Sequence, residues 1–158
     1  MRFLAPFIFI REGERLVMAS IKLATGIKTY DIEDENGNIR GSISFNPADM
    51  NFLVRAEQLR DNVAALSEKL MSETVETEEQ LIAKLEEYDL AIKKEINMLF
   101  DDENTSKVVF GNQSCFNTVK GEPLIEGFLN SILPVIKRDF QREMEKSRDR
   151  IAKYVEVK

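Results

Sequence analysis

The chain has 158 residues, with 28 acidic and 22 basic side chains, one cysteine, and neither histidine nor tryptophan. Without histidine there is no Ser-His or Cys-His nucleophile pair and no imidazole metal ligand, and a single cysteine excludes an internal disulfide. The net charge of −6 argues against general nucleic-acid binding. No apolar run reaches the roughly 18 residues that indicate a membrane-spanning helix.

The N-terminus differs in character from the rest of the chain. Residues 3–10 form an apolar run, but charged residues follow it in place of a signal-peptide cleavage site. Residues 12–14 can be encoded by a purine-rich stretch that matches a bacterial ribosome-binding site, and Met18 follows at a suitable distance. We therefore interpret residues 1–17 as a non-native leader or a disordered extension, with a genuine N-terminal strand or tail as the alternative. Residues 18–158 are expected to form one domain.

The clearest local signal is a β-hairpin around Asn36-Gly37, the preferred pair for a two-residue type I′ turn. This loop places Glu33 opposite Arg40, a favourable cross-strand pair of charges. The alternation of apolar and polar residues predicts one buried face. The residues predicted on that face are Tyr30, Ile32, Ile39, Ile43 and Phe45.

Two helices are predicted to follow the hairpin. Asn46 is a good N-cap and Pro47 suits the first helical position. Apolar residues then recur at spacings of three and four over residues 52–70, and again over residues 81–99 after a capping box that begins at Thr77. Two such helices with a short linker predict an antiparallel helical hairpin.

The last third of the chain is predicted to be an irregular region followed by a long helix. Residues 105–110 suit one short helical turn closed by Gly111. The long helix is expected to begin near Pro123, and apolar residues repeat along it at every fourth position. Pro134 lies inside this helix and removes one backbone hydrogen bond, so we expect a kink there.

The predicted fold class is therefore α+β and mainly helical. An N-terminal β-hairpin packs on the antiparallel helical hairpin and on the long, kinked C-terminal helix. The alternation at Ile21 and Leu23 allows a third strand in the small sheet.

No pattern typical of a catalytic or metal site emerges. The acidic stretch 31–37 fails as a calcium loop because Ile32 and Ile43 stand where the first and last carboxylates are needed. The acids at 101–103 are adjacent and lack the separation that paired-carboxylate catalysis uses. Cys115 is expected to be a small buried residue. We expect no enzymatic activity and no cofactor.

The charge distribution suggests a surface for protein binding. Residues 68–103 hold 12 acids and 4 bases, a balance of −8, whereas residues 137–158 hold 8 bases and 5 acids, a balance of +3. These charges either pair within the fold or form a partner-binding arm. Beyond Pro134 we expect the last helix to extend past the helical hairpin and to expose apolar side chains. The candidate partner-binding residues are Ile136, Phe140 and Met144.

Several features occur together in a fixed order. They are a hairpin ending in Ile43-Ser44-Phe45-Asn46-Pro47-Ala48-Asp49 and followed by Phe52, two acidic helices, a Val109-Phe110-Gly111 loop, and a closing helix with a basic end. Over about residues 18–155, this order resembles small tail-region proteins of phages and prophages of Gram-positive bacteria. Those proteins are commonly regarded as tail assembly chaperones.

The resemblance implies a non-enzymatic role in the cytoplasm of a bacterial host. The expected partner is the long, apolar tape-measure protein, or another tail protein, which the chaperone keeps soluble until tail-tube subunits assemble around it. Self-association stays open. Two other classes also stay open: a structural tail or head–tail joining protein, and a small regulatory protein that binds through its basic last helix.

Overall fold

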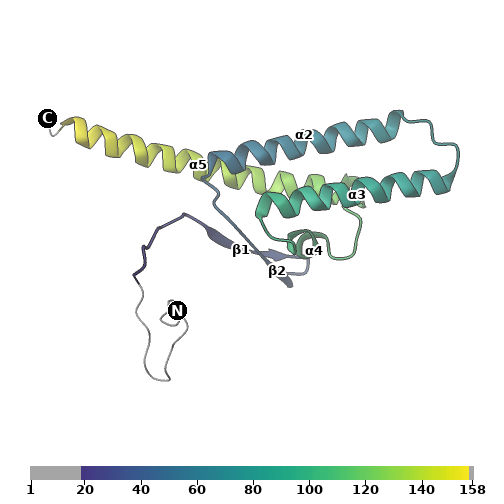
Figure 1. Cartoon of the computed structure of the whole chain (residues 1–158), viewed down its shortest axis with the longest axis horizontal. Helices are drawn as coiled ribbons and strands as arrows, with labels where there is room; N and C mark the ends of the chain where they lie inside the picture. Colours follow the sequence, from purple (N-terminus) through teal and green to yellow (C-terminus); the bar gives the residue numbers. More distant parts are fainter. Residues whose placement is uncertain (1–18, 157–158) are drawn as a thin grey trace, which may run out of the picture.

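The computed structural model describes residues 19–156 and confirms the predicted α+β, mainly helical fold (Figure 1). The proposed leader, residues 1–17, lies outside this range. The elements in chain order are β1 (Lys28–Glu33), β2 (Ile39–Phe45), α2 (Met50–Ser72), α3 (Glu78–Phe100), α4 (Thr105–Phe110), β3 (Thr118–Val119), β4 (Glu122–Pro123) and α5 (Leu124–Glu156). Within the described range, no helix is both long and apolar enough to cross a membrane.

The strands β1 and β2 pair antiparallel, with Tyr30 opposite Ile43 as the alternation predicts. Their turn differs from the prediction. Gly37 N–H donates to the Asp34 carbonyl at 3.0 Å, and Asp34 N–H donates to the Asn38 carbonyl at 2.9 Å, which leaves a loop of three residues. Of the predicted turn pair only the glycine has a positive φ, 82°. This arrangement is typical of a type I turn followed by a left-handed residue, so the predicted type I′ turn is wrong.

The longer loop shifts the pairing at the hairpin tip. A bulge follows Ile32, so that Glu33 lies opposite Ile39 instead of Arg40. The predicted pair of charges is therefore wrong, and Ile39 is exposed although it was predicted on the buried face. The physical cause is a side chain: the Asp34 carboxylate accepts two backbone N–H groups of the loop at 2.9 Å each, which favours this turn.

The segment before β1 does not form the third strand that alternation allowed. Residues 19–27 are not in a strand, and Ile21 is 96% exposed. One hydrogen bond, from Asn46 Nδ2 to the Thr25 carbonyl at 3.0 Å, joins this segment to the end of β2.

The start of α2 is three residues later than predicted. Asp49 is the N-cap, and its carboxylate accepts the N–H of Asn51 at 2.9 Å. The predicted cap, Asn46, instead accepts the N–H of Ala48 at 2.9 Å in the preceding turn. At the start of α3 the predicted cap is confirmed, because Thr77 Oγ1 accepts a backbone N–H one turn into the helix.

The region between α3 and α5 contains a feature that periodicity did not predict. The short helix α4 ends at Gly111, with φ 62°, as expected. Beyond it, β3 and β4 form a small hairpin whose loop residues Lys120 and Gly121 both have positive φ, 54° and 84°. The type I′ turn expected in the first hairpin is therefore found in the second. Helix α5 continues through Pro134, and the expected kink stays a prediction.

The core lies where α2, α3 and the first half of α5 meet the small sheet and α4 (Figure 1). Aromatic rings connect all these elements, with centroid separations between 4.9 and 6.2 Å. The rings are those of Tyr30, Phe45, Phe52, Phe100, Phe128 and Phe110. Pairs of this kind add about 0.5–1.5 kcal/mol each beyond the apolar area that they bury.

Candidate binding surface on the last helix

Helix α5 has a buried half and an exposed half. The buried apolar side chains of the first half are Ile125, Phe128, Leu129, Ile132, Leu133 and Ile136. In the second half every residue from 141 to 155 is exposed, and this half projects past the start of α2 (Figure 1). In the second half, therefore, no side of the helix is covered by another described element.

The three predicted partner-binding residues fall on both sides of the boundary between the halves. Ile136 is fully buried in the core, so the expectation that it is exposed is wrong. The reason is that α2 extends to this level of α5, where Lys137 Nζ lies 3.4 Å from Glu57 Oε1. Phe140 is half-buried, and Met144 is 42% exposed. The exposed surface thus begins about two turns later than predicted.

An apolar stripe runs along the exposed half. Its members lie at helical spacings and share one side of the helix. They are Met144, Ile151, Tyr154 and Val155. Arg148 and Arg150 lie on either side of the stripe, because three positions and one position before Ile151 fall on opposite flanks of a helix with 3.6 residues per turn. Of these four residues, Met144 was among the predicted partner-binding residues.

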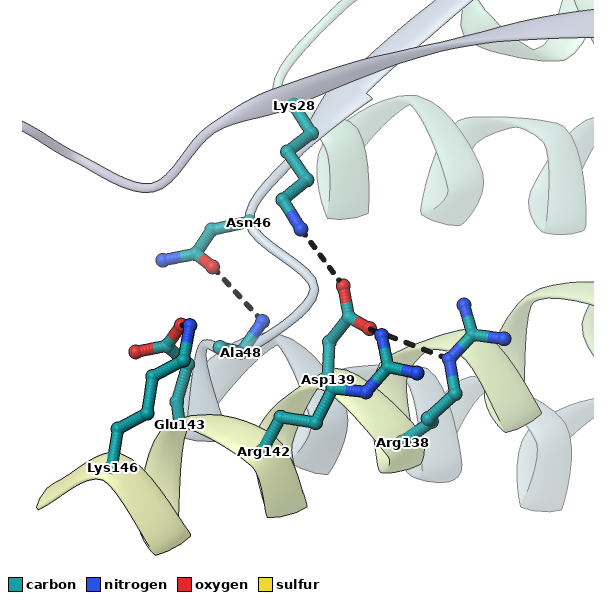
Figure 2. Close-up of polar contacts among 8 residues, drawn as sticks. All are labelled: Lys28, Asn46, Ala48, Arg138, Asp139, Arg142, Glu143 and Lys146. Atoms are coloured by element: carbon teal, nitrogen blue, oxygen red, sulfur yellow. Dashed lines mark hydrogen bonds and ion pairs between the residues drawn. The ribbon is translucent and has the colours of Figure 1, made fainter. Parts of the chain in front are cut away.

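A cluster of charges fixes α5 to the sheet at the base of the exposed half (Figure 2). Asp139 has a side chain only 8% exposed, and its Oδ2 accepts a hydrogen bond from Lys28 Nζ at 3.1 Å. Its Oδ1 lies 3.5 Å from Arg138 Nε and 3.8 Å from Arg142 Nη1. The bond from the lysine holds the pKa of the Asp139 carboxyl below its usual value.

A cleft of about 500 Å³ lies beside this cluster, between α5, the turn before α2 and the segment before β1. Lys28, Arg142 and Lys146 contribute positive charges to its lining, and Asp139 and Glu143 contribute negative ones. Figure 2 shows these side chains on the same side of α5, facing the turn before α2. Arg142, Glu143 and Lys146 belong to the exposed half, but they lie on a different side of the helix from Met144 and Ile151, so the cleft and the apolar stripe are separate surfaces.

Cys115 does not provide a reactive thiol. It is fully buried, as predicted, and burial is the main reason that the pKa of its thiol is strongly raised. Its N–H donates to Asp89 Oδ1 at 2.7 Å, while Lys93 Nζ lies 2.9 Å from Asp89 Oδ2 and donates to the Gln113 carbonyl at 2.8 Å. These contacts fasten the loop to α3 and indicate a structural role.

The acidic groups singled out in the sequence do not converge. Among residues 19–156, no three His, Cys, Asp or Glu side chains are arranged to hold a metal ion. At the hairpin tip the Asp34 carboxylate is occupied by backbone N–H groups of its own loop.

Comparison of the chain with protein-family models, with curated proteins and with solved structures gave no match.

Proposed function

We propose that this protein is a tail assembly chaperone of a phage or prophage. It acts in the bacterial cytoplasm, where the exposed half of α5 binds amphipathic helices of the tape-measure protein. The observation that supports this proposal is that residues 141–155 are all exposed while carrying an apolar stripe on one side. Exposed apolar side chains that share one side of a helix are typical of a surface that binds a partner.

The dimensions of this surface suit a helix as the partner. Residues 141–155 of a helix extend over about 22 Å, at about 1.5 Å per residue. An amphipathic partner helix with apolar residues every three or four positions would cover the stripe along this length. An interface of this size is small, so a single contact is weak, and coating a long protein reversibly requires many weak contacts.

The charges of the protein suit the same role. Arg148 and Arg150, on either side of Ile151, form a polar rim beside the apolar stripe. The body of the protein is acidic, with a balance of −8 (12 acids, 4 bases) over residues 68–103. Repulsion between acidic bodies on neighbouring copies would keep a coated tape-measure protein soluble.

Co-purification tests the proposal. The protein is produced together with the tape-measure protein encoded in the same tail gene cluster, and the retained complex is quantified. Ile151→Asp should reduce retention by about tenfold or more, because it places a charge in the stripe. The matched control is Lys153→Gln, which changes the net charge by the same amount on the other side of the helix and should retain the partner.

Other outcomes favour the other classes. Equal retention by both variants would show that the exposed half does not bind the tape-measure protein. Recovery of the protein from purified virions by mass spectrometry would favour a structural tail or head–tail joining protein. Retardation of DNA with a steep salt dependence would favour a regulator.

A further inference from the structure

The segment before β1 presents apolar side chains that no described part of the chain covers. Ile21 is 96% exposed, Leu23 is 79% exposed and Ile27 is 60% exposed. Ile21 and Leu23 alternate with Lys22, and in a strand this alternation gives one apolar face and one charged face. The segment therefore has the pattern of a strand, although it pairs with no strand of its own sheet.

Local contacts direct this segment away from the helices. The Thr25 carbonyl accepts the bond from Asn46 Nδ2 at 3.0 Å. Gly26 follows with a positive φ of 78°, and a Cβ atom there would lie only 3.0 Å from Asn46 Nδ2. Figure 1 shows the segment continuing outward from the start of β1, beyond the sheet. Its apolar side chains are therefore presented to another molecule.

The strand β1 has an edge that no described strand covers. The first sheet consists of β1 and β2, and no backbone group of residues 28–33 bonds to the backbone of another described segment. A groove of about 500 Å³ lies beside this edge, between β1, α4, the hairpin of β3 and β4, and the first turns of α5. Gly127 and Ser131, one turn apart on α5, line the groove and leave it open because both are small.

The groove has an apolar floor and an acidic rim. Its buried or half-buried apolar members include Ile32, Val109, Leu124, Phe128 and Ile132. Its exposed acidic members are Asp31, Glu33 and Glu122, and no lysine or arginine is among the described residues that line it. A strand that fits this groove has apolar side chains on one face and a cation on the other. None of residues 19–27 lines the groove of its own chain.

We infer that residues 20–24 of one copy add as a strand to the free edge of β1 in a second copy. Within β1, Tyr30 and Ile32 are half-buried and face the helices, while their neighbours are exposed. Ile21 and Leu23 of the added strand extend this inner face and fill the groove. Backbone hydrogen bonds along the edge provide affinity, as in other cases of strand addition.

The charges match in the same arrangement. Asp31 and Glu33 alternate with the half-buried residues of β1, so both lie on the outer face of the sheet. Lys22 lies on this outer face when its two apolar neighbours lie on the inner face. Opposite charges on neighbouring strands stabilise their pairing. Because one chain carries both the strand and the groove, a second copy is the partner that this surface fits.

Light scattering on the full-length protein, up to millimolar concentration, tests the inference. The average mass should rise above that of one chain as the concentration increases. Leu23→Asp should raise the dissociation constant at least tenfold, because it places a carboxylate in an apolar groove with an acidic rim. Leu90→Asp is the matched control, since Leu90 is 61% exposed on α3 and lies outside both surfaces. A single-chain mass throughout, or equal effects of the two variants, would overturn the inference.

A mixture of two variants identifies the surfaces that meet. Leu23→Asp keeps the groove intact, whereas Ser131→Tyr keeps the segment intact and places a large side chain in the groove. Ser131 is exposed, so its replacement leaves the core unchanged, which circular dichroism verifies. Each variant alone should stay a single chain at concentrations where the unchanged protein associates. An equimolar mixture should associate again through one intact segment and one intact groove, and a mixture without association contradicts the inference.

The charge of Lys22 gives a third readout. Lys22→Glu should weaken association, Lys22→Arg should preserve it, and the difference between them should shrink as salt is added. Equal association of these two variants would contradict the acidic rim as a determinant. Protection of the amides of residues 20–24 from hydrogen exchange in a single chain would show that the segment folds back on its own β1, and would also overturn the inference. All these measurements use the protein alone, so failure here is distinguishable from failure of the proposed function.

Discussion

The first half of α5 and the half that follows Asp139 carry the same kind of apolar stripe, yet the first stripe is buried and the second is exposed. Periodicity is a property of one helix, whereas burial depends on which other elements reach it. Here α2 begins at Met50 and pairs with α5 through Glu57, and beyond this level no described element covers the helix. A periodic stripe therefore indicates a contact without indicating whether it is internal or with a partner.

The largest expected change in stability comes from truncating an isoleucine in the buried half, and the same truncation in the exposed half is its control. Ile136→Ala should lower the free energy of unfolding by about 2–5 kcal/mol, because a fully buried side chain leaves a cavity. Ile151→Ala should change it by no more than about 0.5 kcal/mol, because Ile151 is exposed. Urea denaturation followed by circular dichroism measures both values. Similar losses at the two positions would remove the distinction between the halves.

A smaller effect is expected at the boundary between the halves. Asp139→Ala should lower the free energy of unfolding by about 1 kcal/mol, because its ion-pair partners are largely exposed to solvent. Lys28→Ala is the companion variant, and the two losses should not add, since both remove the same bond. Additive losses would show that the two residues act independently.

The same residue should produce a pH dependence. The lowered pKa of Asp139 in the folded state means that the unfolded chain takes up this proton first. The stabilisation that Asp139 contributes is therefore complete at pH values above its unfolded pKa of about 3.9. It is lost as the pH falls through the lower pKa that Asp139 has in the folded state. Below that range, the difference in stability between the unchanged protein and Asp139→Ala should disappear in denaturation experiments repeated across pH.

The smallest effect on stability is expected from removing the exposed half. A chain that ends after Lys146 keeps the cluster around Asp139, and the described side chains that it loses, those of residues 147–155, are all exposed. Its free energy of unfolding should change by less than about 0.5 kcal/mol, so the denaturation midpoint should stay nearly the same. The helical signal in circular dichroism should fall, because helical residues are lost. A marked drop in the midpoint would show that the distal residues contact the body of the protein.

The fold was largely predictable because its strongest signals are local. Alternation placed Tyr30 opposite Ile43 correctly, and the capping residues of α3 were identified. One error occurs where two residues compete for one role. Asn46 and Asp49 are both good N-caps, and only the structure shows that Asn46 is engaged by Ala48 and by the segment before β1.

The candidate surface was predictable in character but not in position. The stripe on α5 is visible in the sequence, but the burial of Ile136 depends on how far α2 extends along it. The bond between Lys28 and Asp139 joins residues 111 positions apart, and no pattern connects them.

The chain of aromatic rings has a consequence for how the protein folds. It begins at Tyr30 in β1 and reaches Phe128 in α5 through rings that are never more than 6.2 Å from the next. Contacts between segments so distant in the chain form late, since they require closure of long loops. The helical hairpin can form early from local contacts, but the sheet gains its aromatic neighbours only when α2, α3 and α5 are in place. Sheet and helices should therefore unfold in a single transition.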